Sequence, residues 1–135
     1  MEHIVETSFV RDRVFKAVID DHELVMDAPE EGPSAGPSPK KMMLASLAAC
    51  TGIDVVSILA KMKVGYSHFK ISTRATLTDD HPKIYSSVYI IYSIRVAKED
   101  EQKVKKAVDL SVEKYCGVMA MFEKFAKIKI EIKYE

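Results

Sequence analysis

Two cysteines, Cys50 and Cys116, are the residues of this 135-residue chain best suited to covalent chemistry. Both lie inside strongly apolar segments with helical periodicity, and such segments must pack against one core. If the two sulfurs meet, one thiolate can attack a peroxide O–O bond and become a sulfenic acid, which the second thiol converts to a disulfide. A dithiol reductant then restores both thiols. The alternative is that each cysteine is a small buried apolar residue, and spacing alone does not decide between the two.

The composition argues against several classes of function. The 20 basic and 20 acidic side chains cancel, so nothing indicates nucleic acid as a partner. The two cysteines and four histidines lack C-x-x-C or H-x-x-x-H spacing, so we expect no metal site. Lys or Asp interrupts the apolar stretches before about 18 residues, so we expect no membrane segment, and the first ten residues do not resemble a leader. We therefore expect a cytoplasmic protein whose cysteines are thiols or a cycling redox couple.

The stretch 38–63 is predicted to be the central helix that carries Cys50. Ser38 is a candidate N-cap, and Pro39 suits the first helical position, where a missing N–H costs nothing. Apolar residues fall on nearly every face, which predicts a buried helix. Small residues recur every three or four positions, so another element is expected to approach closely. They are Ala45, Ala48, Ala49 and Gly52.

The flanking segments predict a single α+β domain, 1–135, with antiparallel pairing. Strands are expected at 3–10 and 14–20 as a hairpin and at 23–28, then at 67–77 and 84–96 as a longer hairpin, and at 127–134. A helix from about residue 100 leads to Cys116, and helical structure resumes after Gly117 until about residue 125. The side chains expected to face inward from that helix are Val104, Ala107, Val108, Ser111, Val112 and Tyr115.

Three motifs carry a family resemblance. The run GPSP before an apolar helix ending in LAAC, then IDVVSIL, and later AVDLSVEKYCGVMAMFEK, resembles the OsmC and organic hydroperoxide resistance (Ohr) family over essentially the whole chain. The resemblance implies an OsmC-like fold, with two central helices packed with antiparallel sheets in an intertwined homodimer. It also implies that organic hydroperoxides are reduced to alcohols, with Cys50 attacking and Cys116 resolving. No cofactor is implied beyond an external dithiol reductant.

The chain departs from the family pattern at the start of its central helix. The pattern pairs an arginine in the first turn of the chain with a glutamate near the start of the helix, and the ion pair steadies the active thiolate. Arg11, in FVRDR, falls about where that arginine should, with Arg13 close by. The glutamate is missing, because Lys40 and Lys41 occupy the expected positions. Thr51 follows Cys50 where the best-characterised peroxidases tend to have an aromatic residue. These departures place the chain nearer the OsmC-like branch.

Two further groups of residues lie near the cysteines in the sequence. Asp54 is one helical turn after Cys50, and a buried carboxylate there needs a basic or hydroxyl partner. A structural or interface role for Asp54 is favoured over a role in the thiol's polar network, since its charge would raise the thiol pKa. Met42, Met43 and Met119 are candidates for an adaptable apolar substrate pocket, although methionines at such spacing are also typical of a core.

The leading hypothesis is therefore a thiol-dependent peroxidase acting on organic hydroperoxides through Cys50 and Cys116. The alternative is a redox-sensitive or apolar-ligand binding protein of the same fold, with little peroxidase turnover. A third interpretation, a purely structural dimer module, predicts unreactive buried thiols.

Overall fold

The computed structural model describes residues 1–135, and the chain forms two units, residues 1–44 and residues 45–135. The boundary falls inside the central helix, so the N-terminal strands belong to the first unit and both cysteines to the second. The α+β class predicted from the sequence is confirmed, with two three-stranded sheets, one long helix between them in the chain and further helices before the last strand. The prediction of a single domain stays a prediction.

The first unit is an antiparallel meander of β1 (Glu6–Arg11), β2 (Val14–Ile19) and β3 (His22–Met26). The predicted hairpin is confirmed, with Phe9 opposite Phe15 and their rings 5.6 Å apart. Asp20 and Asp21 both have positive φ in the two-residue turn before β3. Aspartate tolerates this left-handed region better than most residues, which explains why the turn forms there.

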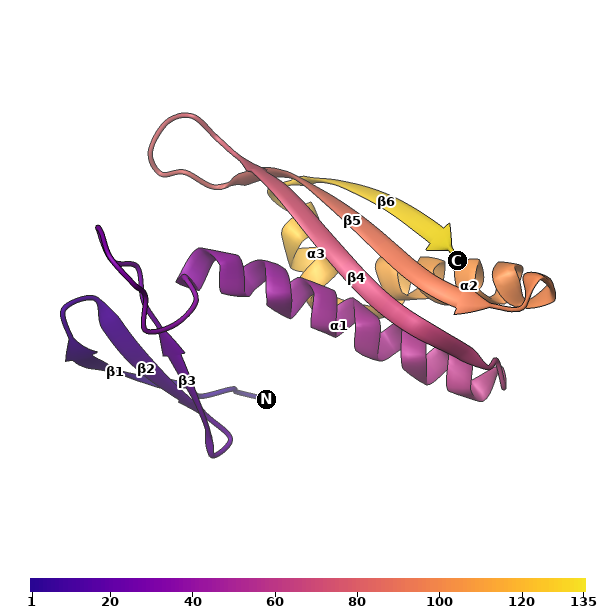
Figure 1. Ribbon diagram of the computed structural model, residues 1–135, viewed down its shortest axis with the longest axis horizontal. Helices are drawn as coiled ribbons and strands as arrows, with labels where there is room; N and C mark the ends of the chain where they lie inside the picture. The colour runs from indigo at the N-terminus through magenta and orange to yellow at the C-terminus, as the bar shows by residue number, and fades with distance from the viewer. The chain divides into compact units, whose positions relative to one another are not determined.

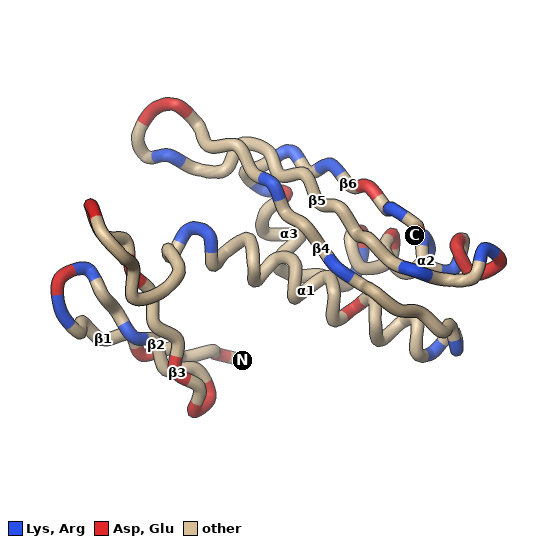
Figure 2. Tube along the Cα trace, in the orientation of Figure 1, with Lys and Arg blue, Asp and Glu red and all other residues tan.

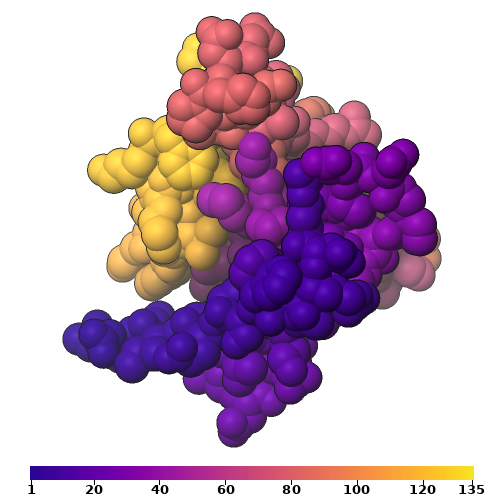
Figure 3. Space-filling model, turned by 90° about the vertical axis from the view of Figure 1, so that its left-hand side faces the viewer, coloured from indigo at the N-terminus to yellow at the C-terminus, as the bar shows by residue number.

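Much of the apolar surface of this meander is exposed. Val14 and Ala17 are its only buried apolar residues. In the space-filling view of Figure 3, indigo and violet atoms of this unit face the viewer. A sheet of three short strands gains stability when one face is covered. The large apolar side chains of these strands that remain exposed are Phe9, Val10, Phe15, Val18, Leu24 and Val25.

Helix α1 (Pro39–Lys61) begins where the sequence predicts. The Ser38 hydroxyl accepts a hydrogen bond from the Lys41 N–H at 3.3 Å, so Ser38 is the N-cap. The predicted complete burial of α1 is not found within one chain, because its buried residues form a single row, Leu47, Thr51, Val55 and Leu59. Ile53, on another face, is 64% exposed.

The apolar character of α1 has a second consequence. By length and composition alone this helix is long and apolar enough to cross a membrane, with a mean hydropathy of 1.9 and 22% of that window buried. The core helix of a soluble protein passes the same test of length and composition, so the expected absence of a membrane segment stays a prediction.

The second unit is built on a sheet of β4 (Tyr66–Leu77), β5 (Tyr85–Val96) and β6 (Lys127–Tyr134), with β5 in the centre. The strand expected at 84–96 is confirmed, and the side chains of Val88, Ile90, Tyr92 and Ile94 on alternate positions of β5 are buried. One pair departs from the predicted antiparallel pairing, because β6 runs parallel to β5. The helical connection through residues 97–126 is long enough to return the chain to the same end of the sheet, which a parallel pair requires.

The helices of that connection complete the unit. A 3₁₀ turn (Lys98–Asp100) leads into α2 (Glu101–Leu110), followed by the π-helical segment η2 (Ser111–Tyr115) and α3 (Gly117–Glu123). Figure 1 shows these helices and α1 below the sheet as drawn. The predicted close approach to α1 occurs at Gly52, where an added Cβ would lie 3.1 Å from Cδ1 of Ile71 on β4. The core of the unit therefore lies between the sheet and these helices.

Candidate active site

The fold brings the two cysteines together in the second unit. Cys50 lies half-buried near the middle of α1, and Cys116 lies between η2 and α3 with 4% of its surface exposed. Both are free thiols, and Cys50 lies close enough to raise the pKa of Cys116. Residues 66 positions apart in the chain are thus neighbours in the fold, and Cys50 is the more accessible of the two.

The surroundings of Cys116 keep it protonated. Burial, followed by the hydrogen bond with Cys50, raises the pKa of Cys116 from 9.0 to about 12. The backbone N–H of Met119 donates to the Cys116 sulfur at 3.3 Å and acts in the opposite direction, but more weakly. Cys116 is therefore a neutral thiol near pH 7, which is the form unsuited to attack a peroxide first.

A π-helical turn aims Cys116 into the core. The Cys116 N–H bonds the Ser111 carbonyl at 2.8 Å, an i to i+5 bond that accommodates one residue more than an α-helical turn. Because of this extra residue, residue 116 takes the position around the helix axis that residue 115 would take in a regular α-helix. The sequence prediction that Tyr115 faces inward is accordingly wrong, because Tyr115 is 53% exposed while Cys116 takes the inward position.

A chain of hydrogen-bonded side chains lies beside the cysteines. Thr51 Oγ1 is 2.8 Å from Tyr92 Oη and 2.7 Å from Ser111 Oγ, and Ser111 Oγ donates to Asp54 Oδ2 at 2.9 Å. Thr51, Tyr92 and Ser111 are completely buried, and no buried side-chain N or O in the protein lacks a partner. Burial raises the pKa of Tyr92 to about 12, so its phenol stays protonated.

Sequence reasoning identifies one of the four members of this chain and misses the hydrogen-bonding role of the other three. The prediction that Asp54 needs a hydroxyl or basic partner is confirmed by Ser111. In the sequence Thr51 stands out only as a departure from the family pattern and Ser111 only as an inward-facing residue of its helix. Tyr92 lies within the strand expected at 84–96 without a signal of its own. The signal that could have found them is a pair of hydroxyl side chains, Thr51 and Ser111, inside otherwise apolar helical stripes, because buried hydroxyls require partners.

A pocket of about 570 Å³ opens beside Asp54. Asp54 and Tyr115 line it at the end near the cysteine segments, and the ammonium-bearing side chains of Lys61 and Lys106 line it as well. Its apolar wall is made by Ile58, Met62 and Leu110. The pocket therefore combines cations with apolar surface. No group of three or more His, Cys, Asp or Glu side chains lies close enough together to hold a metal ion.

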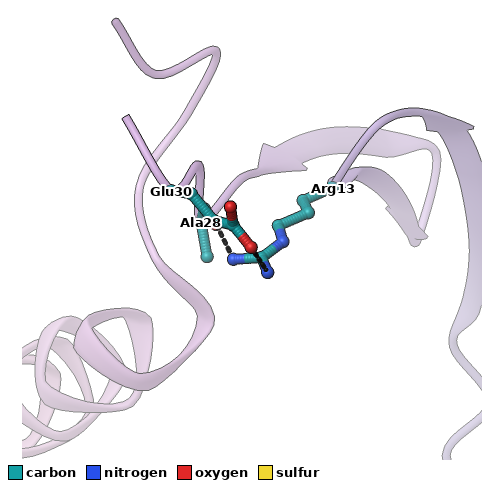
Figure 4. Close-up of polar contacts among 3 residues, drawn as sticks. All are labelled: Arg13, Ala28 and Glu30. Carbon is teal, nitrogen blue, oxygen red and sulfur yellow. Dashed lines mark hydrogen bonds and ion pairs between the residues drawn. The ribbon is translucent and has the colours of Figure 1, made fainter. Parts of the chain in front are cut away.

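The predicted arginine lies in the first unit. Arg11 ends β1 and lines a pocket of about 510 Å³ there, and no ion pair or hydrogen bond engages its guanidinium. The neighbouring Arg13 is occupied instead, since Figure 4 shows its guanidinium bound to Glu30 at 2.6 Å and to the Ala28 carbonyl at 3.1 Å. Of the two arginines, Arg11 is therefore the one free to bind another group. Its role at the cysteines stays a prediction.

The three methionines proposed for a substrate pocket fall in different environments. Met119 is completely buried in the second unit, where its N–H contacts Cys116. Met42 and Met43 belong to the first unit, at the start of α1, and Met43 is 44% exposed. The pocket they are expected to form stays a prediction.

Comparison with known proteins places these features in a family context. The family model described as OsmC-like protein matches residues 32–132. Protein YhfA of Escherichia coli is 33% identical over 107 residues, which cover 79% of this chain and 78% of that protein. A hypothetical protein from Aquifex aeolicus has a similar structure, with a TM-score of 0.89, 28% identity and coverage of 100% of this chain and 97% of that one.

A more distant structure has a name that refers to hydroperoxides. The organic hydroperoxide resistance protein OhrB of Bacillus subtilis aligns with a TM-score of 0.65 and 17% identity, over 98% of each chain. At that identity the likeness concerns the fold alone.

The hydrogen-bonded chain generates a stability prediction. Replacing Thr51→Val keeps the shape but leaves Ser111 and Tyr92 without their shared partner, so the free energy of unfolding should fall by about 1–3 kcal/mol. Thr76→Val, at an exposed position of β4, is the matched control and should change it by less than about 0.5 kcal/mol. Urea titration followed by circular dichroism measures both, and equal effects would show that the Thr51 hydroxyl contributes nothing specific.

Proposed function

Because this chain belongs to the OsmC-like protein family, we propose that it is a thiol-dependent peroxidase that reduces organic hydroperoxides to alcohols. The observation that supports the proposal most directly is that Cys50 and Cys116 are neighbouring free thiols in a fold shared with organic hydroperoxide resistance proteins. A pair of adjacent thiols, one half-buried and one buried, is the arrangement that a two-cysteine peroxidase needs.

The reaction uses both thiols in turn. The Cys50 thiolate attacks one peroxide oxygen, the O–O bond breaks, and the departing alkoxide takes a proton and leaves as the alcohol. Cys50 is then a sulfenic acid. The Cys116 sulfur attacks the Cys50 sulfur, the S–O bond breaks, and the hydroxyl leaves with the thiol proton as water. Two electrons have passed from the two sulfurs to the peroxide, and an external dithiol returns them by exchange with the disulfide.

The order of the two cysteines follows from their surroundings. Cys50 is the more accessible sulfur, whereas Cys116 is buried and its high pKa keeps it protonated until a sulfenic acid is present. We therefore assign attack to Cys50 and resolution to Cys116. In this proposal the protein acts in the reducing cytosol, where a thiol reductant regenerates the pair.

The two roles predict different single-residue phenotypes. Cys50→Ser should abolish consumption of cumene hydroperoxide, whereas Cys116→Ser should consume one equivalent and then stop with Cys50 as a sulfenic acid. A ferrous-xylenol orange assay for peroxide, together with mass spectrometry after dimedone trapping, measures both outcomes. Peroxide consumption by Cys50→Ser at the parent's rate would refute the mechanism.

We also propose that Arg11 supplies positive charge to the Cys50 thiolate. Its guanidinium has no ion-pair partner within its own chain, while Arg13 is already held by Glu30. Lys40 and Lys41 stand where the family has a carboxylate, so Arg11 does not have its usual counter-ion at the helix start.

Replacing each arginine tests this assignment. Arg11→Ala should lower the rate of peroxide consumption by roughly tenfold to a hundredfold, because a cation near the thiolate would be lost. Arg13→Ala is the matched control and should retain most of the parent's rate. Stopped-flow measurement of Cys50 oxidation compares them, and a larger loss in Arg13→Ala would reassign the role.

The working form that we propose is a homodimer. Only 22% of the most apolar window of α1 is buried within one chain, and Ile53 and Met121 are each more than 60% exposed. The strands of the first unit leave several apolar side chains uncovered as well. A second copy of the chain is the cover that the family resemblance implies, and burial of that surface supplies the driving force.

The dimer prediction is tested by molar mass. Light scattering after size exclusion should give twice the 15.2 kDa of one chain. Ile53→Asp should produce monomers or loss of fold, because a carboxylate would enter the apolar interface. Leu77→Asp, at the 40% exposed end of β4, should remain dimeric. A monomeric parent at all concentrations would overturn the proposal.

A second candidate function is a redox-sensitive binding protein for apolar ligands. The missing glutamate and the pocket of about 570 Å³ beside Asp54 favour it. The apolar pocket expected from Met42, Met43 and Met119 would serve either function. Negligible turnover on every hydroperoxide, together with a ligand that co-purifies with the protein, would select this candidate.

A further inference from the structure

The hydrogen-bonded chain beside the cysteines has a defined direction. A carboxylate can only accept hydrogen bonds, so the Ser111 hydroxyl donates its single hydrogen to Asp54. The Ser111 oxygen must then accept the hydrogen bond from the Thr51 hydroxyl. Thr51 has then used its own hydrogen and must accept from the phenol of Tyr92. The order is therefore Tyr92 to Thr51 to Ser111 to Asp54, and the charge of Asp54 orients every hydroxyl behind it.

The same residues hold the two segments that carry the sulfurs. Thr51 directly follows Cys50 on α1, and Asp54 lies one turn further along that helix. Ser111 begins η2, and its carbonyl accepts the N–H of Cys116. Ser111 therefore binds α1 through its side chain and Cys116 through its backbone. Any displacement of Ser111 would change the distance between the two cysteine sulfurs.

Asp54 is also an isolated charge. Figure 2 shows α1 without charged residues between its ends except at one acidic position, which is Asp54. A neutral asparagine would satisfy Ser111 equally well, and a half-buried carboxylate without an ion-pair partner costs stability. Burial is the main cause of the raised pKa of Cys116 and of Tyr92, and the negative charge of Asp54 adds to both.

Several titratable or charged groups face this carboxylate or the thiol that it affects. They are Cys50 and Lys61 from α1, Tyr92 from β5, Lys106 from α2, Tyr115 from η2, and Cys116. The two lysines share the pocket with Asp54, and neither forms an ion pair within 4 Å. Asp54 is the only carboxylate among the side chains that line that pocket.

We propose that Asp54 is a positioning residue of the cysteine pair: through Ser111 and Thr51 it fixes the approach of the two sulfurs, and its charge raises the pH at which they join. The inference rests on the redox pair proposed above and adds the group that regulates it. The carboxylate adds to the burial and to the effect of Cys50 that keep Cys116 protonated, so the dithiol form persists at neutral pH.

Diamide tests this role without a hydroperoxide. The Cys50 thiolate adds to the N=N bond, and the Cys116 sulfur then attacks Cys50 and displaces the hydrazine. Two electrons pass from the sulfurs to diamide, and the two thiol protons end on its nitrogens. With excess diamide, acid quenching and mass spectrometry monitor closure of the bridge from pH 5.5 to 9.5.

The two parts of the role give separate signatures. Asp54→Asn keeps an acceptor for Ser111 but removes the charge, so the pH midpoint of bridge closure should fall by roughly one pH unit. Ser111→Ala keeps the charge but removes the connection, so closure should slow by roughly tenfold across the pH range, because the sulfurs are less well held. Asp109→Asn is the matched control, since Asp109 pairs with Lys105 on α2, and it should behave as the parent.

The other possible results of these experiments separate the role of Asp54 from the peroxidase proposal. An Asp54→Asn profile that coincides with the parent's overturns the electrostatic role, and an unchanged rate in Ser111→Ala overturns the positioning role. Failure of diamide to join Cys50 to Cys116 in the parent overturns the inference entirely. A bridge that forms with diamide, with no consumption of any hydroperoxide, refutes the peroxidase proposal and leaves the role of Asp54 intact.

Discussion

The two hydrogen bonds of the Thr51 hydroxyl are the interaction on which the second unit depends most. It is completely buried and bonded to both Tyr92 and Ser111, so a single oxygen joins the central helix, the central strand and the π-helical segment. Apolar packing between such elements tolerates small shifts, whereas two short hydrogen bonds to one atom do not. Because Cys50 precedes Thr51 and Cys116 is bonded to Ser111, this local rigidity extends to both sulfurs.

The sequence predicts the local structure well. Ser38 caps α1, the alternation along β5 defines its buried face, and the terminal strand Lys127–Tyr134 has the predicted limits. These features follow from neighbouring residues, through capping, periodicity and turn preferences. The need of Asp54 for a polar partner was also predictable, because burying an isolated carboxylate is unfavourable in any fold.

The features that the sequence did not predict depend on contacts between distant segments. Parallel pairing of β6 with β5 depends on the path of the helical connection, which periodicity does not describe. The outward position of Tyr115 depends on the i to i+5 bond at Cys116, and a pattern that assumes α-helical spacing places it inside. The partnership of Thr51, Tyr92 and Ser111 joins three elements, and only their packing brings the hydroxyls together.

The π-helical segment has a consequence for how this family can change. It holds one residue more than an α-helix would need between Ser111 and Cys116. Loss of one codon there would place the cysteine four residues after Ser111, which is the inward position of a regular α-helix. A relative that lacks this residue could therefore hold its cysteine in the same place without a π-helical turn. Its sequence would align with this chain through a one-residue gap between Ser111 and Cys116.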